Sequence, residues 1–152
     1  MQKFHFKLQP LINKEHIYEN ECIGRLRIIQ DKLLKEEDKL RNLKNQKIIC
    51  QNDLKSKKPH DITSVELRSY EEYFLKLGSE INSGNIKLQE MVKKLRIVQE
   101  ELAKIVRKRK ALERLRERWE GEYKDYLVSL SNKEMDDIAM TKFINKMVIK
   151  ND

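Results

Sequence analysis

The sequence predicts an all-α protein, a long two-helix antiparallel coiled-coil hairpin with an overhanging C-terminal helix. Three observations predict it. Apolar residues recur at alternating three- and four-residue spacing from Tyr70 to Leu130, a shorter stripe of the same spacing precedes them, and one short break separates the two. A 3.5-residue repeat keeps a narrow seam facing a partner helix. We therefore expect the 152 residues to form a single coiled-coil domain.

Composition and charge agree with this fold. Charged residues make up 38% of the chain, which has four glycines and two prolines, as is typical of long helices. No apolar run approaches the length of a membrane span, and the first residues lack the apolar core of a signal peptide. We therefore expect a cytoplasmic protein. Cys22 and Cys50 lie four heptads apart on one predicted helix, so we expect them to be free thiols.

The first helix is expected over about residues 10–56, followed by a turn over about 57–62. Pro10 suits a first helical turn, where its missing N–H is not needed, and Pro59 disfavours helical geometry in the residue before it. The seam of this helix contains two charged positions among its ten. These positions are Cys22, Leu26, Ile29, Leu33, Glu36, Leu40, Leu43, Lys47, Cys50 and Leu54.

The second helix is expected over about residues 63–130. Thr63 and Glu66 have the spacing of a capping box, which satisfies free N–H groups at a helix start. The link is too short for a domain linker, so the helices should fold back as a hairpin. The seam positions of the second helix are Tyr70, Phe74, Leu77, Ile81, Gly84, Leu88, Met91, Leu95, Val98, Leu102, Ile105, Arg109, Leu112, Arg116, Trp119, Tyr123, Tyr126 and Leu130.

The register of the hairpin follows from the position of the turn. Facing residues in an antiparallel pair have a constant sum of numbers, which a turn near residues 60–61 sets to 120 or 121. This register pairs Cys22 with Val98 and Glu36 with Gly84. The first arm would end opposite about residue 116, which leaves four seam residues beyond it without a partner, namely Trp119, Tyr123, Tyr126 and Leu130. A helical extension over about 131–148 either continues the helix or folds back on it.

No motif for catalysis is present. The three histidines are scattered, and the sequence has no glycine-rich phosphate loop, nucleophile elbow or metal-ligand cluster. We expect no enzyme, no cofactor and no metal.

Residues 93–118 hold eleven basic and four acidic residues, a local net charge of +7. Basic helices can neutralise phosphates, but no aromatic residue interleaves these charges and no nucleic-acid module is visible. An acidic protein surface or a solvated flank remain the alternatives, and we expect no nucleic-acid partner.

Two groups of aromatic residues are candidate binding surfaces. The unpaired stripe from Trp119 to Leu130 combines aromatic residues with nearby arginines, the composition of interface hot spots. Alternatively, residues 135–147 fold back over it, or two chains cover each other. Near the turn, Tyr70 and Phe74 lie on the predicted seam, whereas Tyr73 lies beside it and should be partly exposed.

Four segments of the chain resemble one known family. The opening Lys3-Phe4-His5-Phe6-Lys7-Leu8-Gln9-Pro10-Leu11-Ile12 is similar to an "F-x-F-x-L-Q-P-L-L" start. Tyr70-Glu71-Glu72-Tyr73-Phe74 falls where the family has a short aromatic motif. Ala111-Leu112-Glu113-Arg114-Leu115 and Lys133-Glu134-Met135-Asp136-Asp137-Ile138-Ala139 are similar to its "A-L-E-x-L" and "K-x-M/L-D-E-x-A" signatures. In order and spacing these segments resemble the flagellar export protein FliJ family, the stalk family of type III secretion.

This resemblance implies a non-enzymatic hairpin similar to the central stalk of rotary ATPases. In the family, the end that carries the termini inserts into the hexameric export ATPase, FliI, and promotes its assembly and activity. The turn end approaches the cytoplasmic domain of the export gate, FlhA, and members also handle export chaperones. The implied location is the cytoplasm, at the flagellar basal body on the inner membrane, with membrane contact through partners only.

The resemblance carries two sets of residues onto this chain. The residues expected to face the ATPase ring are Leu112, Arg116, Trp119, Tyr123, Met135 and Ile138. The residues expected to face the export gate are Tyr70, Tyr73, Phe74 and Leu77. The basic central segment departs from strongly acidic family members, so ring contacts differ in detail. The alternatives are a generic structural coiled coil, a virulence-secretion stalk or chaperone escort, and a basic coiled coil that binds nucleic acid.

Overall fold

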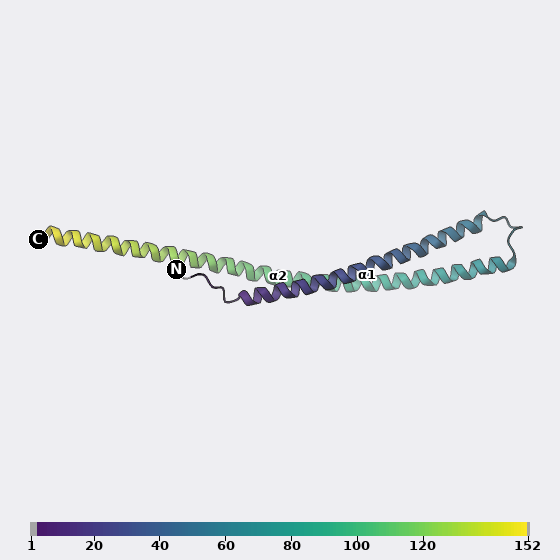
Figure 1. The fold of residues 1–152 in the computed structure, drawn as a ribbon, viewed down its shortest axis with the longest axis horizontal. Helices are drawn as coiled ribbons and strands as arrows, with labels where there is room; N and C mark the ends of the chain where they lie inside the picture. The colour runs from purple at the N-terminus through teal and green to yellow at the C-terminus, as the bar shows by residue number, and fades with distance from the viewer. Residues whose placement is uncertain (1–2, 152) are drawn as a thin grey trace. The chain divides into compact units, whose positions relative to one another are not determined.

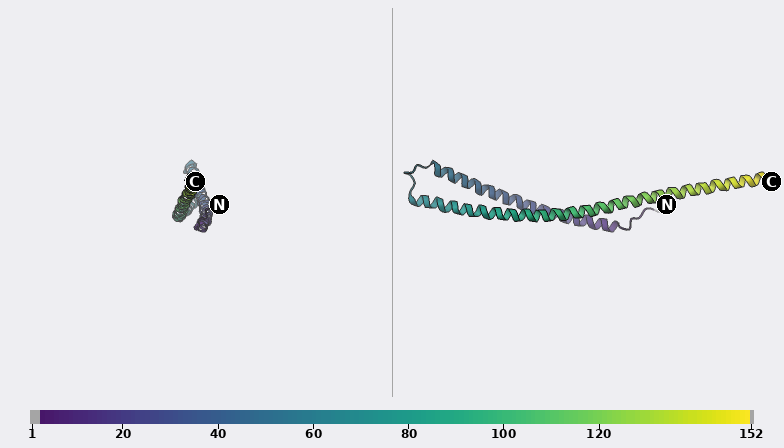
Figure 2. Two further views of the ribbon diagram at one scale, coloured as in Figure 1. Left: turned by 90° about the vertical axis from the view of Figure 1, so that its left-hand side faces the viewer. Right: turned by 180° about the vertical axis from the view of Figure 1, so that it is seen from behind.

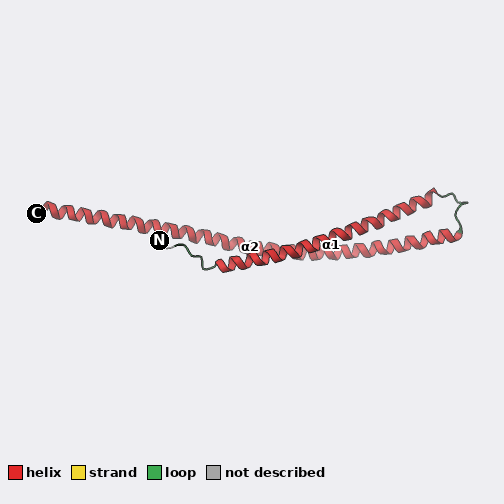
Figure 3. Ribbon diagram, in the orientation of Figure 1, coloured by secondary structure: helices red, strands yellow, loops and turns green. Residues whose placement is uncertain are grey.

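The computed structural model describes residues 3–151, which form two helices and no strand. Helix α1 spans Gln9–Ser56 and helix α2 spans Ser64–Asn151 (Figures 1 and 3). The two helices pack against each other, so the predicted all-α hairpin is confirmed. Helix α2 passes Leu130 without a break and continues to Asn151 (Figure 2), so the extension does not fold back on the helix that precedes it.

The ends of the helices have local causes. The opening residues 3–6 are non-helical, and the N–H of Gln9 donates to the carbonyl of Phe6 at 3.1 Å at the start of α1. At the start of α2 the N–H of Glu66 donates to Oγ1 of Thr63 at 3.1 Å. This contact confirms the predicted cap at Thr63, which accepts from one of the N–H groups that have no intrahelical partner.

Contacts divide the chain into two compact units. One unit comprises Tyr18–Lys104, and the other comprises the segments on either side, up to Ile17 and from Ile105 onward. We call them the central unit and the terminal unit, and describe each by itself.

The central unit is held together by the predicted seam. All ten α1 seam positions from Cys22 to Leu54 are buried or half-buried, and so are the α2 positions from Tyr70 to Leu102. Cys22 is fully buried, and its Sγ donates to the carbonyl oxygen of Val98 at 3.5 Å. The predicted pairing of these two residues is therefore confirmed. Both cysteines are free thiols.

The helices approach closely at Gly84. A Cβ atom added to Gly84 would lie 3.0 Å from Cδ1 of Leu40, which is itself buried. Beside this contact the carboxylate of Glu36 accepts from Nζ of Lys87 at 3.0 Å, and Lys39 lies 3.7 Å away. The hydrogen bond from Lys87 lowers the pKa of Glu36 below its ordinary value. The charge of Glu36, which interrupts the apolar seam of α1, is therefore neutralised by Lys87 of α2.

The terminal unit corrects one expectation. Trp119 and Tyr123 do not lack partners, because Phe6 packs against Trp119 and Phe4 packs against Tyr123. The opening residues are not helical. An extended chain advances about 3.3 Å per residue, against 1.5 Å in a helix. A few non-helical residues therefore reach further along α2 than a helical register predicts. From Lys124 to Lys150 the side chains of α2 are all exposed.

Candidate functional site

The terminal unit contains an aromatic cluster formed by Phe4, Phe6, Trp119 and Tyr123. Phe6 meets Trp119 edge-to-face, with ring centroids 5.3 Å apart and planes inclined by 68°. Phe4 lies 5.7 Å from Tyr123 and 6.4 Å from Phe6 between centroids. Phe6 is only 4% exposed, whereas Trp119 remains 38% exposed. The cluster therefore supports the Trp119 ring from one side and leaves part of it open to solvent.

Charged side chains of α1 and α2 are paired in the same unit. Glu15 is 5% exposed, and Nζ of Lys108 lies 3.2 Å from its Oε1. Arg109 donates to both carboxylate oxygens of Glu113, at 3.0 and 3.1 Å, and Nε2 of His16 lies 3.7 Å from Glu113. Paired geometry of this kind compensates the desolvation of buried charge. Lys108 and Arg109, the central pair of the basic run at 107–110, are thus engaged with carboxylates inside the unit.

The structure brings together some of the residues expected to face the ring. Trp119 and Tyr123 meet in the aromatic cluster, Leu112 is half-buried, and Arg116 is exposed. Met135 and Ile138 lie further along α2 and are 66% and 57% exposed. The six residues therefore form two surfaces on α2, one at the aromatic cluster and one on the exposed turns that follow it.

The residues expected to face the gate have unequal access to solvent. Leu77 is 2% exposed and belongs to the core of the central unit. Tyr70 and Phe74 are half-buried, and Nζ of Lys57 lies 5.1 Å from the centroid of the Tyr70 ring. A hydrogen bond with the Tyr70 hydroxyl raises the pKa of Lys57. Tyr73 is 40% exposed, so among these four residues it is the one whose ring a partner can reach directly.

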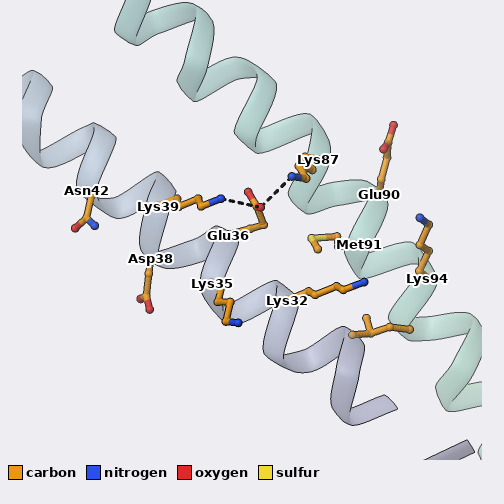
Figure 4. A pocket seen from close by; sticks show the side chains of 11 residues that line it. Lys32, Lys35, Glu36, Asp38, Lys39, Asn42, Lys87, Glu90, Met91 and Lys94 are labelled. Atoms are coloured by element: carbon orange, nitrogen blue, oxygen red, sulfur yellow. Dashed lines mark hydrogen bonds and ion pairs between the residues drawn. The ribbon is translucent and has the colours of Figure 1, made fainter. Parts of the chain in front are cut away.

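The central unit has a groove between the helices that is rich in lysine (Figure 4). Ile29 and Met91 contribute apolar side chains, and the Glu36 carboxylate lies between Lys39 and Lys87. The remaining lining residues are Lys32, Lys35, Asp38, Asn42, Glu90 and Lys94. Within residues 3–151, no group of three or more histidines, cysteines and carboxylates is arranged to hold a metal ion.

Sequence reasoning missed the role of Phe4 and Phe6. Their alternation two residues apart ahead of Pro10 is a signal for an extended strand-like segment with one apolar side. It also missed the pairing of Glu15 with Lys108. A heptad register predicts which backbone positions face each other, but it does not predict how far a long side chain extends.

No helix within the described residues combines the length and the apolar character that crossing a bilayer requires. A family model described as "Flagellar FliJ protein" matches residues 4–148. The search of curated proteins and the search of solved structures found no match. The match to the family model includes all four residues of the aromatic cluster and the exposed turns of α2 up to Val148.

Proposed function

We propose a function from the premise that this chain belongs to the flagellar FliJ protein family. Membership supports a role in flagellar protein export as a non-enzymatic component. The finer proposal is that the chain is a central stalk, which promotes assembly and activity of the hexameric export ATPase FliI and links it to the export gate FlhA. Its location would be the cytoplasm, at the basal body. Export chaperones are further proposed partners.

The aromatic cluster is the observation that carries this proposal. The Trp119 ring is partly exposed, and Phe6 packs against it edge-to-face. Arg116 is exposed one turn earlier on α2. A partly buried tryptophan beside an arginine is the composition of a binding hot spot. Because the ring is already held in place, a partner that covers it orders fewer side chains on binding.

Met135 and Ile138 supply a second contact for the ring. They are three residues apart and therefore share one side of α2. Both are more than half exposed, so burial in a partner would remove apolar area from water. For the export gate, Tyr73 is the proposed contact, because it is exposed whereas Leu77 is buried in the core.

The test is ATP hydrolysis by the flagellar export ATPase of the same organism, with and without this protein. We expect stimulation together with ring assembly. A Met135→Asp/Ile138→Asp double variant should lose the stimulation, because aspartate would be buried in an apolar contact. Ser129→Asp, an exposed change on the opposite side of the helix, should retain it. Circular dichroism should show unchanged helicity in both variants.

Absence of stimulation, with both proteins folded, would contradict the stalk role and favour an adaptor for the export gate or for export chaperones. Equal stimulation by the double variant and by Ser129→Asp would show that the exposed turns do not face the ATPase.

The second candidate is a structural coiled coil that dimerises through the exposed apolar residues of α2. The exposure of Tyr126, Leu130 and the residues beyond them favours it. Sedimentation equilibrium separates the two functions. A dimer with a dissociation constant below about 1 μM, equivalent to more than about 8 kcal/mol, would favour the dimer over the stalk.

A further inference from the structure

The last turns of α2 have an apolar side that no part of the described chain covers. Its residues stand at positions i, i+3, i+4, i+7 and i+8, which places them on one side of a helix. They are Met140, Phe143, Ile144, Met147 and Val148, with exposed fractions of 66%, 62%, 53%, 52% and 58%. More than half of each side chain is therefore open to solvent.

A row of lysines borders this apolar side on the same turns. Lys142, Lys146 and Lys150 recur every four residues and are all exposed, so they form a row on one side of the helix. Ile149 interrupts this side. The segment from Ala139 to Lys150 contains three lysines and no acidic residue, a net charge of +3. Within residues 3–151, none of these three lysine side chains makes a hydrogen bond or ion pair.

The amphipathic segment does not belong to the contacts described above. The opening residues reach α2 at Trp119 and Tyr123, and Met140 lies more than four helical turns beyond Tyr123. Since its side chains are exposed, the segment can change its surroundings without disturbing the seam.

We propose that residues 139–150 bind the surface of an anionic lipid bilayer, with the helix lying in the plane of the interface. A helix with one apolar side and a lysine-rich polar side buries the former at the boundary between headgroups and acyl chains. Lysines extend their ammonium groups toward the headgroups, where a negative surface attracts each of them. The three lysines beside the apolar side, with no acidic residue among residues 139–150, favour an anionic surface as the occupant.

This inference goes beyond the proposed function. It concerns a direct contact with lipid, whereas the stalk would reach the membrane through its protein partners. It uses none of the residues assigned to the ATPase or to the gate. Because only five apolar side chains and three lysines contribute, the contact is weak and reversible.

The test is flotation of the full chain with two kinds of vesicle. One kind contains phosphatidylglycerol and phosphatidylcholine, and the other contains phosphatidylcholine alone. We expect binding to the first kind, weakened by added salt because screening shortens the range of the attraction. Phosphatidylcholine alone should bind far less protein.

Two pairs of variants locate the contact. Phe143→Gln should lower partitioning at least tenfold, because burial of its ring is lost, and Asn145→Gln on the lysine side should change it less than about twofold. Lys142→Gln/Lys146→Gln should lower binding to the anionic vesicles about 25-fold, about fivefold for each lysine. Lys124→Gln, where the lysine lies 3.9 Å from Glu120, is the matched control outside the segment.

Three results would overturn the inference. The first is an absence of binding to anionic vesicles at low salt. The second is equal binding by Phe143→Gln and the unmodified chain. The third is a dimer in sedimentation equilibrium that Phe143→Gln dissociates, which would assign the apolar side to a second copy. Stimulation of the export ATPase by Phe143→Gln, measured in parallel, should persist and keeps this test separate from that of the stalk.

Discussion

Phe6 packs edge-to-face on Trp119, with ring centroids 5.3 Å apart. This contact joins a non-helical residue at the start of the chain to the side of α2. It gives the opening segment a structural role, because Phe6 is 4% exposed and belongs to the core of the terminal unit.

Replacing Phe6 with alanine should free the opening segment and expose Trp119. Burial of a phenylalanine contributes about 2 kcal/mol, so its loss shifts the segment toward the detached state. Trp119 is the one tryptophan of the chain, and its fluorescence therefore reports on this site alone. We expect a red shift of the emission and stronger quenching by iodide, with unchanged helicity. Tyr126→Ala, at a position 59% exposed, should leave both signals unchanged, and a Phe6→Ala spectrum like that of the parent would contradict the contact.

Alanine at two glycines of α2 should have different effects. At Gly78 an added Cβ meets nothing within 4 Å, whereas at Gly84 it would lie 3.0 Å from Leu40 Cδ1. Alanine is favoured over glycine in a helix by about 1 kcal/mol. Gly78→Ala should therefore raise the free energy of unfolding by about that amount, and Gly84→Ala should give no gain. Urea denaturation measures both, and equal gains would show that Leu40 moves aside freely.

Truncation of neighbouring leucines should separate the seam from the surface. Leu77 is 2% exposed and Leu75 is 75% exposed. Leu77→Ala should lower the free energy of unfolding by about 3 kcal/mol, since it removes buried methyl groups and leaves a cavity. Leu75→Ala should change it by less than about 0.5 kcal/mol. Thermal denaturation followed at 222 nm compares them, and similar losses would place Leu77 outside the core.

Acid should weaken the central unit through Glu36. The hydrogen bond from Lys87 lowers the pKa of Glu36 below 4.5, its ordinary value. A carboxyl group with a lowered folded pKa contributes stability above the unfolded pKa, and loses it as the pH falls through the folded pKa. The free energy of unfolding should therefore decrease below about pH 4.5.

Lys87→Gln tests the cause of this acid sensitivity. It should reduce the loss of stability between neutral pH and pH 3, because the pKa of Glu36 returns toward its ordinary value. Lys93→Gln, at an exposed position on the same helix, serves as the control and should retain the full pH dependence. Identical pH profiles for the two variants would assign the acid sensitivity to other carboxylates.

The seam of the central unit could be predicted from the sequence because its 3.5-residue period is a property of helices that coil around each other. Every α1 position from Cys22 to Leu54 that the heptad pattern selects is shielded, and the turn position sets Cys22 against Val98. The cap at Thr63 could be predicted because it depends on residues three apart in sequence. These features are local or periodic.

The candidate site was less predictable because it departs from that period. Phe4 and Phe6 precede α1, so a helical register places them short of the α2 residues they contact. The pairs at Glu15 and Glu113 depend on the reach of Lys108 and on the rotamer of Arg109. Neither property is encoded in the spacing of apolar residues. The assignment of partner-binding residues to the ATPase or to the gate remains a prediction.

The ion pair between Glu15 and Lys108 bears on axial sliding. A coiled coil with a repeating seam can slide by seven residues and still match most of its apolar positions. Such a slide would separate the Glu15 carboxylate, 5% exposed, from the ammonium 3.2 Å away. An uncompensated buried charge costs about 3–5 kcal/mol. A slipped pairing is therefore disfavoured far more strongly than it would be by the mismatch of apolar seam positions alone. The terminal unit therefore has one axial alignment, and motion imposed on one of its helices is passed to the other.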